Sequence, residues 1–147
     1  MSYVLKFDTA TEFKPVRIKP QFQLFADAFN GTGEYFSLAF SWKVFEHTEF
    51  TFDNEEEYHE LGHNFSTRHG VTMDHSLTDD KAVGWALIAS SSNHPSFHLE
   101  TLNLSTSFTH EYYRDLLKYS FSPFIGFAKL DNFKGKVGAS FSLTFMM

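Results

Sequence analysis

The chain has 147 residues, the length of one domain, and we expect residues 1–147 to form a single domain. Hydrophobic residues make up 42% of it, which excludes global disorder, and the absence of cysteine excludes disulfides and thiol chemistry. The formal net charge of −6, without any basic tract, argues against direct binding to nucleic acid.

The first residues, MSYVLKFDTATEF, lack the positive charge and the apolar core of a signal peptide. No apolar run approaches the length of about 20 residues that a membrane-spanning helix needs. We therefore expect a cytoplasmic location. The outer membrane is the alternative if a signal has been removed.

Alternation of apolar and small polar residues predicts β-strands in the first third of the chain. The alternation is clearest in YFSLAFSWKVF, 35–45, where Phe36, Phe40 and Trp42 share one face. The turn NGTG, 30–33, has residues that tolerate positive φ and joins this strand to the one before it. We expect strands over 3–8, 13–18, 20–29 and 35–45, and 48–52 is expected to continue the last of these past a bend.

The character of the sequence changes over 53–80, DNEEEYHELGHNFSTRHGVTMDHSLTDD. This stretch is polar, acidic and rich in histidine, and it shows no alternation. We interpret it as a long polar insertion, which either holds a short helix or is an excursion from the sheet. Long excursions of this kind are uncommon and often functional.

Alternation returns in the second half of the chain and is cleanest in VGASFSLTF, 137–145. Residues 111–118 are a candidate for a short helix, and part of a strand is the alternative. The remaining strands are expected over 82–90, 98–109, 119–128 and 137–145. The predicted fold is mainly β, a β-rich α+β domain. It is a single antiparallel sandwich or barrel of about seven to eight strands with a long polar insertion and one short helix.

The sequence leaves open which face of this sheet is wet. In a water-soluble protein the apolar face is the core. In an outer-membrane barrel the apolar face meets lipid and small polar residues fill the interior. The final strand and YSFSPFIGF, 119–127, resemble the closing strands of small bacterial outer-membrane barrels, and this likeness in pattern covers about the last third of the chain.

One short motif, HELGHNFSTRH at 59–69, has the spacing of zinc ligands. On a helix, His59 and His63 would lie on one face, Glu60 would stand beside them, and His69 would return as a third ligand. The motif resembles that of the metzincin zinc metalloproteases. The resemblance implies zinc bound by the three histidines, Glu60 as the catalytic base, and a peptide bond as the target.

Our leading functional hypothesis is a non-enzymatic binding or structural module, such as a small acidic inhibitor or assembly-type protein. The acidic segment 53–80 would be its recognition surface. The partner would be a protein, and a basic protein would complement the acidic charge. The candidate contact residues are Glu55, Glu56, Glu57, Asp79 and Asp80. This hypothesis needs no cofactor. The alternatives are the zinc peptidase and the small outer-membrane barrel.

Overall fold

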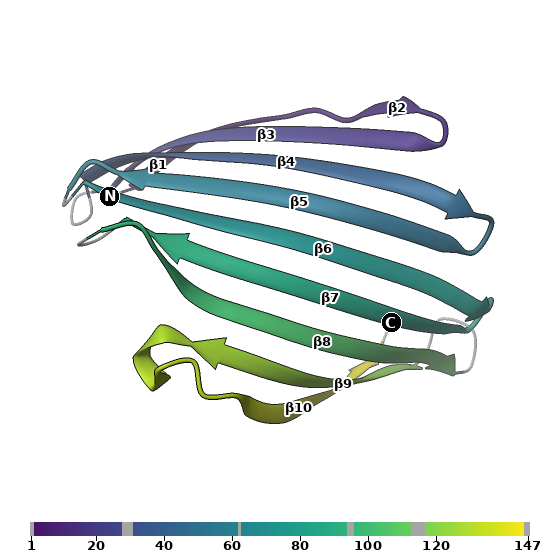
Figure 1. Ribbon diagram of the computed structural model, residues 1–147. Helices are drawn as coiled ribbons and strands as arrows, with labels where there is room; N and C mark the ends of the chain where they lie inside the picture. The colour runs from purple at the N-terminus through teal and green to yellow at the C-terminus, as the bar shows by residue number, and fades with distance from the viewer. Residues whose placement is uncertain (1, 28–30, 62, 94–95, 113–116, 146–147) are drawn as a thin grey trace.

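The computed structural model describes residues 2–27, 31–61, 63–93, 96–112 and 117–145, and its strands form one antiparallel sheet (Figure 1). The mainly-β antiparallel fold is therefore confirmed, with ten strands rather than seven to eight. The strands are β1 Ser2–Asp8, β2 Thr11–Phe13, β3 Val16–Asp27, β4 Gly31–Phe45, β5 Thr48–His59, β6 Asn64–Thr78, β7 Lys81–Ser92, β8 His98–Tyr112, β9 Leu117–Ala128 and β10 Lys136–Phe145.

The sheet is a meander in which each strand pairs with the next one in the chain, apart from short β2, which pairs with β3 beside β1. Strands β1 and β10 form the two edges of the sheet, and the sheet curls between them (Figure 1). The 3₁₀ turn η1, Lys129–Asp131, is the only helical element in the described part of the chain. None of the described helical residues forms a helix long and apolar enough to cross a membrane.

The predicted insertion over 53–80 was wrong, because most of it is strand. Residues 53–59 complete β5, and β6 pairs with β5 on one side and with β7 on the other. Alternation failed as a signal here because DNEEEYH has polar residues on both faces of its strand. Neighbouring strands supply the pairing instead.

The short helix expected over 111–118 is not found where the structure describes this segment. Residues 111–112 end β8 and residues 117–118 begin β9. Residues 113–116 lie outside the described residues. Strand pairing of Tyr112 with Leu117 decides the local structure, because it extends the ladder that the alternating residues of β8 and β9 have already formed.

Register places large apolar residues side by side on one face, which we call the apolar face. Residues paired across an antiparallel ladder share a face, so the pairing can be followed from strand to strand. One continuous row crosses eight strands from β3 to β10: Ile18, Phe40, Phe52, Val71, Leu87, Leu104, Ile125 and Val137.

The opposite face, the polar face, carries small and charged residues. The row next to the one above reads Lys19, Ala39, Asp53, Gly70, Ile88, Asn103, Gly126 and Lys136. A Cβ added to Gly70 would stand 2.5 Å from the Asp53 carboxylate, and one added to Gly126 would stand 2.5 Å from Asn103 Oδ1. Side chains therefore crowd together on this face, and small residues such as glycine and serine leave room for them. Because crowding of this kind is expected on the inner side of a curled sheet, we assign the polar face to the concave side.

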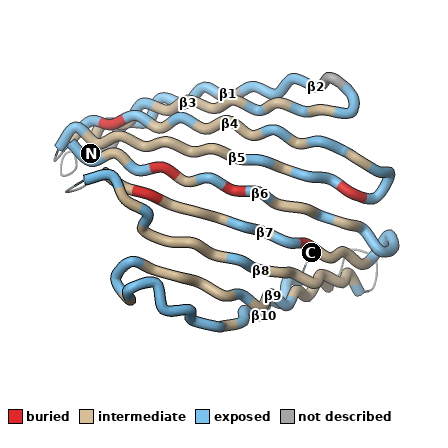
Figure 2. The backbone as a smooth tube through the Cα atoms, in the orientation of Figure 1, coloured by how far each residue is buried: buried red, intermediate tan, exposed pale blue. Residues whose placement is uncertain are grey.

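The described part of the sheet encloses no apolar core. No hydrophobic side chain in the described ranges is buried, and few positions of any kind are (Figure 2). On β4 the large residues Phe40 and Trp42 are exposed by 39% and 53%, whereas small Ser37 and Ala39 on the polar face are half-buried. The fold thus buries its polar side more than its apolar side.

Candidate functional site

The zinc motif lies on a hairpin rather than on a helix. His59 is the last residue of β5, and His63 sits in the turn to β6 with φ of 50°. His59 Nε2 is 3.0 Å from Glu57 Oε1, and the Tyr58 hydroxyl is 3.1 Å from His63 Nδ1. Glu60 accepts a hydrogen bond from the Thr32 hydroxyl. Each of these side chains thus has a protein partner of its own.

The third histidine of the motif is on the other side of the sheet. His59 pairs with Gly33 and points to the polar face, whereas His69 pairs with Asn54 and points to the apolar face. His69 is also five residues beyond Asn64, the strand partner of His59, or about 17 Å along β6. The structure does not bring the three histidines together. The described ranges contain no cluster of three or more metal-ligating side chains.

The five acidic residues proposed as a recognition surface are also dispersed. Glu55 and Glu57 lie on the polar face of β5, and Glu56 lies between them on the apolar face. Asp79 and Asp80 form the turn between β6 and β7, at the opposite end of the strands. Thr67 is the strand partner of Glu56, and Asp79 lies twelve residues beyond Thr67, or about 40 Å along an extended strand.

A charged cluster occupies the middle of the polar face. Arg68 Nη1 is 3.3 Å from Asp53 Oδ2 and 3.0 Å from Glu55 Oε1, so one cation of β6 pairs with two neighbouring carboxylates of β5. At the far end of the same face, Lys118 pairs with Glu111 at 3.0 Å. Sequence reasoning missed Arg68, because its role follows only from the pairing of β5 with β6.

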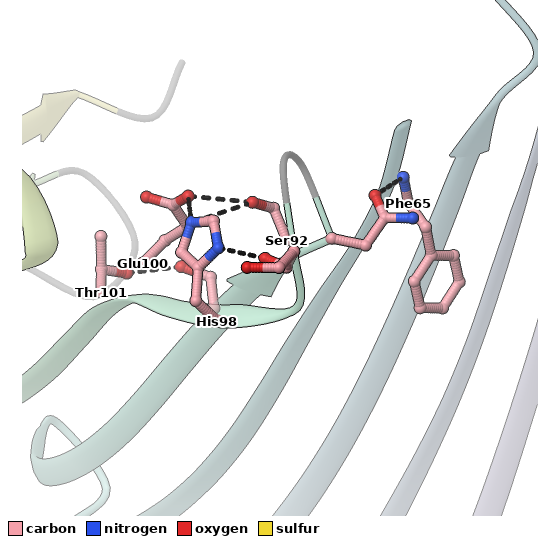
Figure 3. Close-up of polar contacts among 8 residues, drawn as sticks. Phe65, Ser92, His98, Glu100 and Thr101 are labelled. Carbon is pink, nitrogen blue, oxygen red and sulfur yellow. Dashed lines mark hydrogen bonds and ion pairs between the residues drawn. The ribbon is translucent and has the colours of Figure 1, made fainter. Parts of the chain in front are cut away.

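A second polar cluster joins β7 to β8 at the end of the sheet (Figure 3). The Ser92 hydroxyl donates to Glu100 Oε1 at 2.9 Å, and His98 Nε2 also contacts this carboxylate. His98 Nδ1 is bonded to the Ser96 carbonyl. In a hydrolytic triad the serine and the acid face different nitrogens of the imidazole. Here both turn toward Nε2, so the cluster is an ion pair with a hydroxyl attached and does not activate Ser92 as a nucleophile.

The most extensive feature of the molecule is the apolar face itself. We call its continuous run of apolar and aromatic residues the apolar belt. The belt has five residues on β4, from Phe36 to Val44, and five on β10, from Val137 to Phe145. Both tryptophans of the chain, Trp42 and Trp85, belong to it and are exposed by 53% and 41%.

The apolar belt crosses the strands obliquely. Its centre is Phe40 on β4 and Phe141 on β10, but the register connects Phe40 with Val137, four residues before Phe141. Four residues rise about 13 Å, and six steps between strands span about 29 Å, so the belt deviates by about 25° from the perpendicular to the strands.

Polar aromatic residues border the apolar belt where β8 and β9 meet. His110 Nδ1 is 2.9 Å from the Tyr119 hydroxyl, and His110 Nε2 is 3.0 Å from Asp80 Oδ2. Tyr112 stands edge-to-face against His110 with ring centroids 5.5 Å apart, and Tyr119 stacks on Phe141. The rings present apolar bodies to the belt and polar atoms to its margin.

Comparison with known proteins does not identify the chain. No protein-family model matches it, and no curated protein is significantly similar to it in sequence.

Proposed function

We propose that this chain is a membrane protein of the outer-membrane type, whose strands cross the lipid bilayer. The apolar face meets the acyl chains and the polar face lines a polar interior. The observation that carries the proposal is the exposed apolar belt on a sheet without any buried apolar side chain in its described part. The proposed role is structural: a strand-built wall between lipid and water.

The free energy of solvation supports this assignment over a water-soluble monomer. Contiguous exposed apolar patches on soluble proteins rarely exceed a few hundred Å². Here the central row alone places Phe52, Leu87 and Leu104 in solvent with 46%, 47% and 48% exposure. Each large apolar side chain gains about 1.5–3 kcal/mol on full transfer from water. Acyl chains supply that environment without a protein core.

The strand lengths and the slant of the belt fit a planar bilayer. Strands β4, β6 and β8 have 15 residues each, and a tilted strand needs only about 9–11 residues to span the hydrocarbon region. A flat bilayer meets neighbouring tilted strands at different positions of their register. The apolar segment of each strand must therefore shift along the strand relative to that of its neighbour. The drift of about 25° approaches the strand tilt of about 35–45° in such proteins.

The polar aromatic residues and the Arg68 cluster also fit this arrangement. Tyr112 and His110 lie at one margin of the belt, at the end of its run on β8, where amphipathic rings sit at the level of lipid headgroups. The Arg68 cluster lies on the concave side, away from lipid, where charged pairs are tolerated. By contrast, the acidic recognition surface and the zinc site both require residues that the sheet holds apart.

Fractionation of cells that express the full chain with an export signal tests the proposal. We expect the protein in the membrane fraction, resistant to extraction by salt and high pH and released by detergent. An unboiled sample should migrate differently from a boiled one, because the hydrogen-bonded sheet resists unfolding in detergent. A chain that stays in aqueous solution without detergent, with one mobility in both samples, would contradict the proposal.

A further inference from the structure

The sheet ends at two edges that have no strand partner. No ladder joins β1 to β10 among the described residues. Large apolar residues of both edges are exposed, among them Leu5 and Phe7 on β1 and Phe141 and Phe145 on β10. Each edge presents a row of backbone N–H and C=O groups to its surroundings. Acyl chains cannot bond these groups, so the proposed membrane location requires a partner for each edge.

The number of strands makes the two edges run in the same direction. Eight antiparallel pairings lead from β1 through β3 to β10. Each pairing reverses the strand direction, and eight reversals restore it. Strand β2 does not change this, because it pairs with β3 on the same side as β1. Single-chain bacterial outer-membrane proteins have even strand numbers, which close antiparallel. This sheet, by contrast, can close on itself only through a parallel pair.

The register relates the depth of β1 to that of the apolar belt. Leu5, the middle residue of β1, pairs with Leu24, which pairs with Glu34 on β4. Glu34 is six residues before Phe40, the belt centre on β4. Between β4 and β10 the belt centre moves four residues further in the same direction. The belt therefore advances ten residues along the strands from β1 to β10.

This advance brings the two edges to one depth in a bilayer. Ten residues rise about 33 Å and eight steps between strands span about 38 Å, which gives a slope of about 40° for the whole sheet. Strands of membrane-spanning sheets tilt by about 35–45°, so Leu5 and Phe141 lie at the same level. With these two residues opposite each other, Ser2–Asp8 faces residues 138–144, all of which belong to β10.

We propose that β1 and β10 pair with each other in the membrane, which closes the sheet into a ring of nine strands with one parallel seam. This inference rests on the proposed membrane location. The seam sets Leu5 beside Phe141, and both belong to the apolar face. Because the advance of ten residues is even, the two faces continue around the ring without exchange. The hydrogen bonds of the seam satisfy the backbone groups of both edges.

Crowding on the concave side favours closure within one chain over a ring made from two chains. A ring of about eight strands has an interior that side chains just fill, whereas one of about 16–18 strands leaves a water-filled channel. The sheet curls between its two edges (Figure 1). On the polar face, Asp53 already occupies the space above Gly70, and Asn103 occupies that above Gly126. Curvature that brings inner side chains this close belongs to a small ring.

A disulfide across the seam tests the proposal, because the chain has no cysteine of its own. Full-length Leu5→Cys/Phe141→Cys protein in lipid vesicles, oxidised with copper phenanthroline, should form an intramolecular disulfide. A faster-moving monomer band, returned to the wild-type position by reductant, reports it. Adjacent strands hold facing Cα atoms at the distance of about 4.4–6.8 Å that a disulfide needs.

The matched control is Leu5→Cys/Val137→Cys, whose second cysteine lies on the same face of β10. It is about 13 Å along the strand from position 141, so it should not form the bond. Equal cross-linking in the two double variants, or none in Leu5→Cys/Phe141→Cys, would overturn the seam.

A mixture of single variants tests whether the ring contains one chain or two. Leu5→Cys and Phe141→Cys proteins, refolded together into vesicles and oxidised, should remain monomers. A covalent dimer would show that β10 of one copy pairs with β1 of another, and it would overturn closure within one chain.

Nuclear magnetic resonance in detergent micelles checks the seam without any substitution. Backbone protons of residues 4–6 should show Overhauser contacts with those of residues 140–142 in the wild-type chain. Assigned spectra without contacts between β1 and β10 would also overturn the ring.

The outcomes separate this inference from the proposed function. A chain whose tryptophans are quenched by lipid, but which forms no seam disulfide, would refute the ring and leave the membrane assignment standing. A seam disulfide in a chain that stays in water without lipid or detergent would refute the membrane assignment. It would leave the pairing of β1 with β10.

Discussion

Asp74 on β6 faces Glu49 on β5 directly across the ladder, on the polar face. Its carboxylate lies over the bare backbone of Gly84, and this partial burial, followed by the charge of Glu49, raises the pKa of Asp74. A raised pKa means that the folded state holds the proton more tightly than the unfolded state. The contribution of this group to stability is therefore complete at low pH and is lost as pH rises through its folded pKa.

Asp74→Asn should raise the free energy of unfolding at pH 7 by about 0.2–1 kcal/mol, because it removes a like-charge pair across the strands. The gain should disappear near pH 3. Urea unfolding in detergent at both pH values measures it, with Asp79→Asn in the following turn as the control. A variant less stable than wild type at pH 7 would contradict the argument.

Glu100 behaves in the opposite sense. The hydroxyl of Ser92 and then the His98 ring hold the pKa of Glu100 below its usual range. A lowered pKa stabilises the fold above the ordinary pKa of a glutamate, and this contribution is lost as pH falls through the folded pKa. Glu100→Gln should therefore lower the urea midpoint slightly at pH 7 and weaken the loss of stability between pH 5 and 3. If the variant lost as much stability between pH 5 and 3 as wild type does, the Ser92–His98–Glu100 cluster would not stabilise the fold.

Alternation of apolar and small polar residues predicts some strands of this sheet and not others. Strands β4, β7 and β10 were predicted because apolar and small polar residues alternate along them. Strand β6 and the second half of β5 were not, because polar residues occupy both of their faces. These strands form because β5 pairs with β4 and β6 pairs with β7. The sequence of one segment does not show which strands will lie beside it. The same limit concealed the Arg68 cluster.

Tight packing on the concave side gives a prediction for the β4–β5 pair. A Cβ on Gly33 would stand 2.6 Å from the carbonyl oxygen of Tyr58, which is backbone and cannot rotate away. Gly33→Ala should therefore cost about 1–3 kcal/mol of stability. Gly135→Ala, whose nearest contact would be 3.1 Å from the Phe127 ring, is the matched control and should cost less. Equal losses measured by urea unfolding in detergent would contradict the crowding of this face.

At the scale of the whole molecule, the sequence predicted two faces but not which one is wet. Phe36, Phe40 and Trp42 were correctly placed together on one face. Which face is wet depends on the direction in which the sheet curls. That direction depends on glycines such as Gly70 and Gly126, and only the register shows that these two glycines lie on the same face. The histidine spacing at 59–69 predicted ligands on one face of a helix, whereas this segment lies on a hairpin.

Neighbouring residues of β8 test the two faces against each other. Leu104 lies on the apolar face, and Ser105 lies on the polar face. Leu104→Arg should cost about 2–4 kcal/mol, as expected for a cation on the lipid side near the bilayer centre. Ser105→Arg should cost much less. Refolding into lipid vesicles in a urea series measures both, and a harmless Leu104→Arg would place this face in water.

Tryptophan quenching by brominated lipids tests the central claim most directly, because Trp42 and Trp85 are the only tryptophans and both lie in the apolar belt. Trp42 is two residues from Phe40, the belt centre on β4, or about 7 Å along the strand. We therefore predict strong quenching by bromines near the middle of the acyl chain and weaker quenching by bromines near the headgroup. Emission at the wavelength of water-exposed tryptophan, insensitive to bromine at any depth, would contradict the claim that this face meets lipid.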